Sequence, residues 1–122
     1  MRRRAVNRLQ QRDVSRPFSE MKRYWVYILA NRTKVLYVGV TDELKTRVGK
    51  HKTRFYAGAF TKRYNVDMLV YYETFPTAQL AHDRELQLKG LSRAKKIRLI
   101  EARNPEWKDL YDEVQSWIPT SG

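Results

Sequence analysis

Two short runs of aromatic and β-branched residues, separated by only four polar residues, constrain the fold of this chain most. Residues 24–30 (YWVYILA) and 35–40 (VLYVGV) have the composition of β-strands. Gly39, near the end of the second run, indicates a bulge or a close backbone approach. The intervening segment 31–34 (NRTK) has the length of a hairpin loop, so we expect the two strands to pair antiparallel.

Hydrophobic periodicity and capping residues predict the remaining elements. We expect a third strand over 68–73, helices over 43–55, 77–88 and 93–103, and a short final helix opened by Pro105. The predicted order is β-β-α-β-α-α-α. This order describes a small three-stranded antiparallel sheet flanked by helices, which is an α+β fold.

The net charge of +12 is concentrated at the N-terminus. The first 23 residues carry eight Lys and Arg against two acidic residues, and so hold half of the net charge. We expect a flexible basic arm over 1–23, one folded domain over 24–115 and a tail over 116–122. The arm lacks the apolar stretch of a secretory signal, and its acidic residues and few serines disfavour a transit peptide. The charge favours a polyanionic partner: DNA, RNA or an anionic membrane face.

The residue types that are missing narrow the possible chemistry. The 122 residues include no cysteine and two histidines, His51 and His82, so disulfide scaffolds, thiolate metal sites and cysteine nucleophiles are excluded. Any metal must rely mainly on oxygen ligands. No apolar run approaches the ~20 residues that cross a bilayer, and there is no glycine-rich phosphate loop, zinc-protease motif or EF-hand.

One acidic residue lies in line with an apolar helical stripe. Ala81, Glu85 and Leu88 are spaced by four and three residues, which places the Glu85 carboxylate on the apolar face of the predicted helix 77–88. A carboxylate there needs a cation, a metal or a hydrogen-bond network. Spacing alone leaves a structural ion pair equally open.

Other candidate residues are weak when taken singly. Arg47 and His51 lie one helical turn apart and can meet one phosphate, although a solvated basic face is the simpler interpretation. Tyr27 and Tyr37 on the paired strands can bind phosphate or water, but tyrosines in strands usually serve as half-buried packing residues. Asn104 is expected to cap the final helix.

Taken in order, these segments resemble the GIY-YIG nuclease family, in particular its small single-domain branch and the nuclease domain at the N-terminus of the excinuclease that belongs to it. The resemblance is carried by 25–29 (WVYIL), 36–41 (LYVGVT), 44–51 (LKTRVGKH), 60–64 (FTKRY), 69–73 (LVYYE), 84–89 (RELQLK) and 104–110 (NPEWKDL). The two motif tyrosines are ten residues apart, as the family expects. Trp25 stands where the family motif has Gly, and Val26 and Val38 stand where it has Ile; the valines are conservative in strands.

The resemblance implies a GIY-YIG endonuclease fold and metal-dependent hydrolysis of nucleic-acid phosphodiesters. DNA is the expected substrate, with RNA open, in DNA repair or recombination. The implied catalytic residues are Tyr27, Tyr37, Arg47, His51 and Glu85, with Glu85 holding one Mg²⁺ or Mn²⁺. Arg47 supplies hydrogen-bond donors to the phosphate. We expect Tyr27 to be the base and Tyr37 to orient, with the two roles exchangeable and His51 as a further proton acceptor.

The remaining expectations concern binding and the competing functions. The candidate nucleic-acid contacts are Lys62, Arg63, Tyr64, Lys95, Lys96 and Asn104, although a solvated face is the simpler interpretation of the lysines and Arg63. One alternative function is a non-catalytic nucleic-acid-binding module on the same fold. Another is a membrane-surface or protein-interaction role for the arm, which its lack of a lipidation signal disfavours. We expect a cytoplasmic protein that associates with the nucleoid and requires no protein partner.

Overall fold

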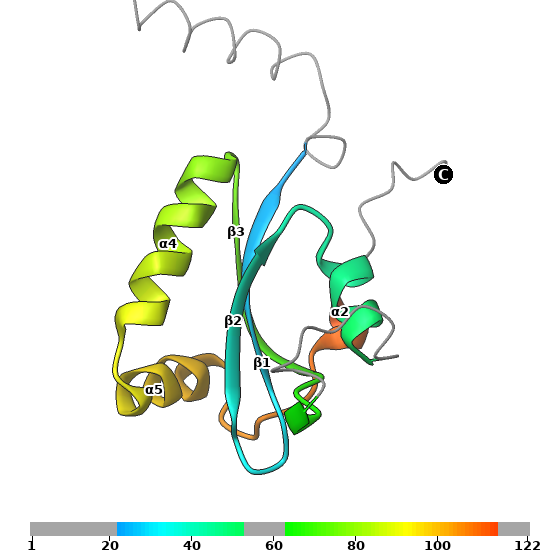
Figure 1. Cartoon of the computed structure of the whole chain (residues 1–122), viewed down its shortest axis with the longest axis vertical. Helices are drawn as coiled ribbons and strands as arrows, with labels where there is room; N and C mark the ends of the chain where they lie inside the picture. The colour runs from blue at the N-terminus through cyan, green and yellow to red at the C-terminus, as the bar shows by residue number, and fades with distance from the viewer. Residues whose placement is uncertain (1–21, 53–62, 115–122) are drawn as a thin grey trace, which may run out of the picture.

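The computed structural model describes residues 22–52 and 63–114. The expectations for the arm before residue 22, for the tail from residue 115 and for Lys62 concern residues outside these ranges. In chain order the elements are β1 (Tyr24–Ala30), β2 (Leu36–Thr41), α2 (Leu44–Lys52), β3 (Met68–Phe75), α4 (Ala78–Gly90), α5 (Arg93–Arg103) and the 3₁₀-helix η2 (Tyr111–Glu113) (Figure 1). In the part of the chain described, no helix is long and apolar enough to cross a membrane.

The three strands form one antiparallel sheet in the order β2-β1-β3. The hairpin of β1 and β2 and the antiparallel third strand confirm the predicted α+β class and order. Tyr27 in the middle of β1 lies opposite Gly39 on one side and Tyr72 on the other. Strand β1 therefore lies between two partners, whereas β2 forms an edge of the sheet.

Helices cover both faces of the sheet, so alternate residues of β1 enter two separate cores. Val26 and Ile28 pack with Ala81 and Leu88 of α4 and with Ile100 of α5. On the opposite face, Trp25, Tyr27 and Leu29 pack with Leu44 and Val48 of α2 and with Val114. Figure 1 shows the same division, with α4 and α5 on one side of the strands and α2 on the other.

The predicted helix starts have side-chain caps. The Thr41 hydroxyl accepts a hydrogen bond from Glu43 N before α2, at 3.0 Å. Thr77 and Ser92 accept from Leu80 N and Lys95 N at 3.2 Å each, and they begin α4 and α5. These caps satisfy backbone donors that the first helical turn leaves unpaired.

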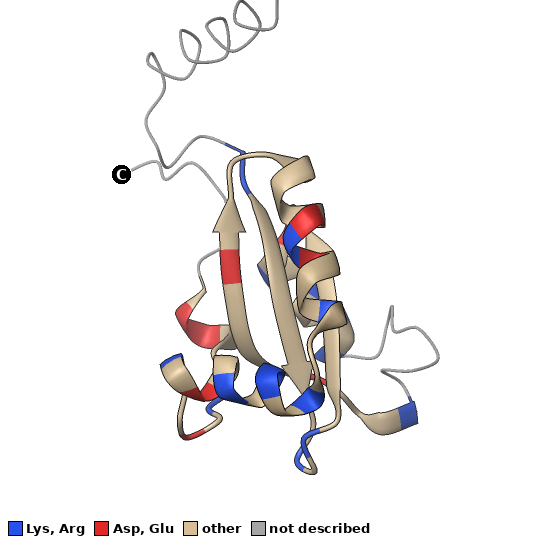
Figure 2. Ribbon diagram, turned by 90° about the vertical axis from the view of Figure 1, so that its left-hand side faces the viewer, with Lys and Arg blue, Asp and Glu red and all other residues tan. Residues whose placement is uncertain are grey.

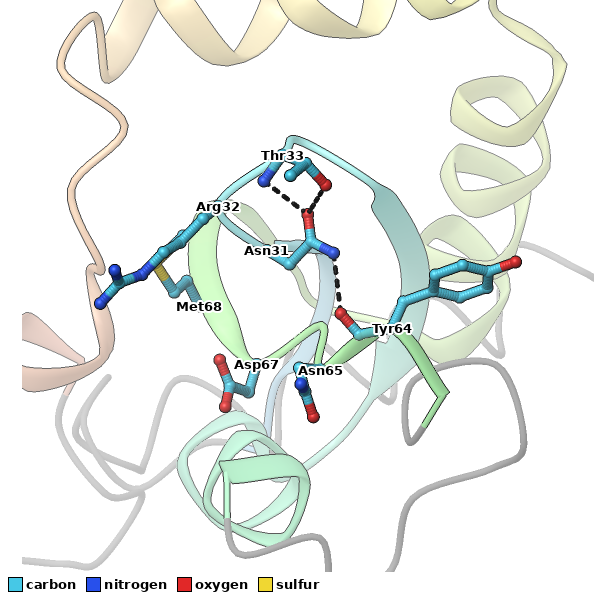
Figure 3. Close-up of a pocket in the computed structure, with 7 residues that line it drawn as sticks. All are labelled: Asn31, Arg32, Thr33, Tyr64, Asn65, Asp67 and Met68. Atoms are coloured by element: carbon cyan, nitrogen blue, oxygen red, sulfur yellow. Dashed lines mark hydrogen bonds between the residues drawn. The ribbon is translucent and has the colours of Figure 1, made fainter.

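Asn31 holds the hairpin loop in shape. Its side-chain oxygen accepts hydrogen bonds from Thr33 N, the Thr33 hydroxyl and Val35 N, each 2.9 Å long. Its side-chain nitrogen donates to the Tyr64 carbonyl at 2.7 Å (Figure 3). The hairpin is therefore tied to the segment that precedes β3, and Val35 belongs to the loop rather than to the predicted strand.

The prediction of a helix opened by Pro105 is wrong. Trp107 has a φ of 56°, in the left-handed region that a right-handed helix does not use, and its N–H donates to the Asn104 carbonyl at 3.0 Å. The chain turns here instead, and the last regular element is the single 3₁₀ turn at Tyr111–Glu113.

Asn104 therefore does not cap a following helix. It ends α5, is 5% exposed, and its side-chain nitrogen donates to the carbonyls of Val70 and Lys108 at 3.1 and 2.9 Å. Its side-chain oxygen accepts from Lys108 N at 3.0 Å. The residue joins α5, β3 and the following turn.

Replacing this junction should cost measurable stability. We expect Asn104→Ala to lower the free energy of unfolding by about 2–3 kcal/mol, because it removes three hydrogen bonds and leaves buried backbone groups unpaired. Glu106→Ala is the matched control, since its carboxylate is 72% exposed and its ion pair should contribute at most about 0.5 kcal/mol. Urea unfolding followed by circular dichroism measures both; equal midpoints would contradict the assigned role.

Candidate active site

Three rings line up between the sheet and α2. Tyr27 of β1 and Tyr37 of β2 have ring centroids 6.3 Å apart, and Tyr37 and the His51 imidazole of α2 have centroids 5.7 Å apart. Tyr27 is fully buried, whereas Tyr37 is half-buried. Of the two tyrosines, Tyr37 is therefore the one that can meet water or substrate directly.

Gly39 makes room for the buried tyrosine. A Cβ atom at this position would lie 2.5 Å from the Tyr27 hydroxyl oxygen and 2.6 Å from the adjacent ring carbon. No side chain fits such a separation, so the glycine is required by the close approach of Tyr27 across the strand pair. The sequence-based expectation of a close approach at Gly39 has this physical cause.

His51 is held in its neutral form. It is 5% exposed, and burial followed by the charge of Arg47 lowers the pKa of its imidazole. Burial disfavours the charged imidazolium, and a nearby guanidinium repels it. A neutral imidazole at neutral pH can accept a proton.

The C-terminal segment clamps the helix that carries Arg47 and His51. The Lys45 ammonium donates to the Tyr111 carbonyl at 2.8 Å and lies 3.9 Å from the centre of the Tyr111 ring. Lys52 forms an ion pair with Asp109 and donates to the Asp67 carbonyl at 3.0 Å. These contacts fix α2 against the sheet.

Gly49 completes this clamp. A Cβ there would lie 3.0 Å from the Tyr111 hydroxyl oxygen, so the ring rests against the helix at the glycine. Sequence reasoning missed the role of Tyr111. The available signal was the spacing of Lys45, Gly49 and Lys52 by four and three residues, which places all three on one helical face.

Glu85 lies in the other layer of the molecule. Its neighbours along the same helical face, Ala81 and Leu88, enter the core on the α4 side of the sheet, and Glu85 itself is 8% exposed. One carboxylate oxygen is 2.9 Å from the Lys89 ammonium and the other is 3.4 Å from His82 Nδ1. The structure thus brings Tyr27, Tyr37, Arg47 and His51 together and places Glu85 across the sheet from them.

An ion pair that the sequence did not reveal fixes the rotation of α4. Arg84, next to Glu85, donates from Nε and from a terminal nitrogen to the two Glu73 carboxylate oxygens, at 2.9 and 3.0 Å. The Tyr71 hydroxyl also donates to Glu73. Burial alone would raise the pKa of Glu73, but hydrogen bonds from Arg84 and Tyr71 outweigh it and lower the pKa. Burial and the bond to Glu73 raise the pKa of Tyr71 to about 12.

The donor set at Glu85 fits a divalent ion with few protein ligands. No group of three or more His, Asp or Glu side chains suited to a metal occurs within 22–52 and 63–114. Mg²⁺ and Mn²⁺ are commonly held by one or two carboxylates, with water and substrate oxygens completing the shell. The Glu85 carboxylate already has a cation at one oxygen, so it lies where positive charge is stabilised.

The predicted nucleic-acid contacts are spread over both layers. Tyr64 is 39% exposed, with the Arg63 guanidinium 5.4 Å from its ring centre. An open pocket of about 430 Å³ lies beside it, lined by Asn31, Arg32, Thr33, Tyr64, Asn65, Asp67 and Met68 (Figure 3). Lys95 and Lys96 lie on α5, whose sequence is strongly basic (Figure 2). Asn104, by contrast, is buried with its side-chain amide engaged in the fold.

Comparisons with known proteins point to one family. The profile of the GIY-YIG catalytic domain matches residues 23–98. A UPF0213 protein of Syntrophus aciditrophicus is 36% identical over 86 residues, which are 70% of this chain and 98% of the relative. One of Natronomonas pharaonis is 38% identical over 77 residues, or 63% and 89% of the two chains. The solution NMR structure of a UPF0213 protein from Bacillus halodurans shares 29% identity, covers 71% of this chain and 92% of its own, and has a TM-score of 0.46.

The close approach at Gly39 can be tested with a matched pair of glycine substitutions. We expect Gly39→Ala to lower the free energy of unfolding by about 1–3 kcal/mol, because the added methyl group displaces the Tyr27 ring from a packed core. Gly90→Ala should leave stability unchanged or slightly raised, since no atom lies within 4 Å of the added Cβ. Urea unfolding measures both; equal destabilisation of the two variants would contradict the packing argument.

The lowered pKa of His51 predicts a pH dependence of stability. Between the folded-state pKa and the ordinary value of about 6.5, the unfolded chain binds more protons at His51 than the folded chain does. The contribution of this residue to stability is therefore complete above about pH 6.5 and is lost as the pH falls through the folded-state pKa.

Nuclear magnetic resonance titration of the His51 ring measures this directly. We expect a pKa below 6.5 that rises in Arg47→Gln, because the repelling charge is gone, and that is unchanged in Arg98→Gln on α5. A His51 pKa at or above 6.5 in the unsubstituted chain would rule out the neutral, buried imidazole.

Proposed function

The chain belongs to the GIY-YIG family, and from this membership we propose that it is an endonuclease that hydrolyses DNA phosphodiester bonds with one bound Mg²⁺ or Mn²⁺. The family is one of nucleases. The observation that carries the proposal is the ring series Tyr27, Tyr37 and His51, which ends beside Arg47 on α2. The choice of DNA, and of repair or recombination as its setting, follows from the family resemblance.

In the proposed reaction, water is activated on the α2 side of the sheet. The water gives a proton to the Tyr37 hydroxyl while that hydroxyl gives its own proton to neutral His51. The water oxygen forms a bond to phosphorus, the bond to the leaving oxygen breaks, and the leaving oxygen takes a proton from solvent. We assign contact with water to Tyr37 rather than to Tyr27, because Tyr27 is fully buried; Tyr27 positions the Tyr37 ring.

Arg47 and Glu85 serve the phosphate in this proposal. The Arg47 guanidinium offers several N–H donors in a fixed fork, which suits the non-bridging oxygens as they gain negative charge. A divalent ion held by Glu85 polarises the phosphate and stabilises the leaving oxygen. The positive charge near His51 and the carboxylate of Glu85 thus act on the same group from different elements.

The two layers suggest where the substrate lies. Tyr37 is on β2, the edge strand, and α4 with Glu85 packs against both β2 and β1 from the opposite face. A phosphodiester that crosses the unpaired edge of β2 can reach both layers. We propose that Arg63 and Tyr64 contact the nucleic acid on the α2 side and that Lys95 and Lys96 contact it on the α5 side.

A non-catalytic nucleic-acid-binding module remains the second candidate. It is favoured by one observation: Glu85 already has Lys89 at one oxygen and lies across the sheet from the tyrosines. Such a protein would bind DNA in a salt-sensitive manner whether or not Glu85 is present.

A cleavage assay separates these candidates. Purified full-length protein should cut DNA with Mg²⁺ or Mn²⁺ and stop when a chelator is added. We expect Arg47→Ala, Tyr37→Phe and Glu85→Gln each to lower kcat/KM by about 10²-fold or more, because each removes a group that acts on the reacting atoms. Single-stranded, duplex, flap and RNA oligonucleotides in parallel identify the preferred substrate.

Two exposed positions supply matched controls. Asp83→Asn lies on α4 two residues before Glu85, and Arg98→Ala lies on α5; both should keep the cutting rate within about twofold. Wild-type rates in folded Arg47→Ala and Glu85→Gln would refute the nuclease proposal. DNA binding with no cutting in any variant would instead support the binding module.

A further inference from the structure

We infer that His82 is a second protein ligand of the divalent ion at Glu85, so that this site prefers Mn²⁺ to Mg²⁺. The inference rests on the proposed function, which assigns the ion to Glu85. His82 lies one helical turn before Glu85 on α4, with Nδ1 3.4 Å from one carboxylate oxygen. Side chains three residues apart on a helix lie on the same face.

The separation of the two donor atoms is that of neighbouring ligands on one ion. Metal–ligand bonds of about 2.1 Å at angles between 90° and 109° place two ligand atoms about 3.0–3.4 Å apart. A direct charge-assisted hydrogen bond is shorter, about 2.7–2.9 Å. Lys89 has this shorter contact with the other oxygen of Glu85, at 2.9 Å. An ion can therefore sit between His82 and Glu85 while Lys89 keeps its oxygen.

The surroundings hold Glu85 still and leave the His82 side open. Arg84 binds Glu73 through two hydrogen bonds, which fixes the helix turn between His82 and Glu85. The Glu85 side chain is 11% exposed, whereas that of His82 is 56% exposed. Water and phosphate oxygens can complete the coordination shell from the exposed side. The same pairing of Glu and His three residues apart on a helix holds metals in di-iron helix bundles.

The imidazole determines the metal preference. Mg²⁺ favours an all-oxygen shell, whereas first-row transition ions bind nitrogen more readily. A site with Glu85 alone would discriminate little between Mg²⁺ and Mn²⁺. Addition of His82 should favour Mn²⁺, and removal of His82 should reduce this preference.

Manganese binding to the full-length protein, without DNA, tests the inference. Electron paramagnetic resonance gives the Kd of Mn²⁺, and pulsed measurements detect coupling of the ion to an imidazole ¹⁴N nucleus. We expect this coupling in the unsubstituted protein and its loss in His82→Ala, with Mn²⁺ affinity lowered about tenfold or more. Competition with Mg²⁺ should show a smaller loss of Mg²⁺ affinity in the same variant.

Control variants keep the outcomes distinct. Asp83→Asn, which changes the exposed neighbour of His82, should bind Mn²⁺ as the unsubstituted protein does, and circular dichroism checks that each variant folds. If Mn²⁺ binds without ¹⁴N coupling, or if His82→Ala matches the unsubstituted affinity, the role of His82 is overturned while the nuclease proposal stands on Glu85 alone. If no Mn²⁺ binds, or if Glu85→Gln keeps full Mn²⁺ binding, both assignments are overturned.

Discussion

The burial of β1 on both faces is the constraint on which the rest of the structure depends. Val26 and Ile28 enter one core while Tyr27 and Leu29 enter the other, so a single strand joins the layer of α4 and α5 to the layer of α2. A shift of one residue in its register would exchange the two sets of side chains. The position of Tyr27 beside Gly39, and hence the ring series that reaches His51, follows from this one register.

The two layers give their candidate catalytic groups different environments. His51 is buried and lies near a guanidinium, conditions that favour a neutral proton acceptor. Glu85 lies on a helix face with Lys89 and His82 beside its carboxylate, where positive charge is stabilised. Proton transfer and cation binding call for opposite electrostatic surroundings, and a sheet between two helical layers can provide both within a small domain.

Local signals predicted most of the elements, whereas tertiary contacts decided the details of the site. The hairpin, the strand after α2 and the helices capped by Thr77 and Ser92 follow from composition, periodicity and capping chemistry. The helix expected at Pro105 does not form, because the turn at Trp107 is stabilised by Asn104 and by contacts distant in sequence. The layer of Glu85 and the burial of Tyr27 relative to Tyr37 depend on packing across the sheet, which periodicity does not show.

The same packing changes the meaning of the positive charge. Lys45 and Lys52 belong to a basic stretch that, in the sequence, suggests a solvated face, yet they hold Tyr111 and Asp109 against α2. Arg84 is likewise committed to Glu73. Such cations stabilise the fold, and a polyanion could recruit them only by breaking these contacts. Net charge therefore overstates the electrostatic surface for nucleic acid, and within the described residues α5, with Lys95 and Lys96, is a more suitable tracking surface than the lysines of α2.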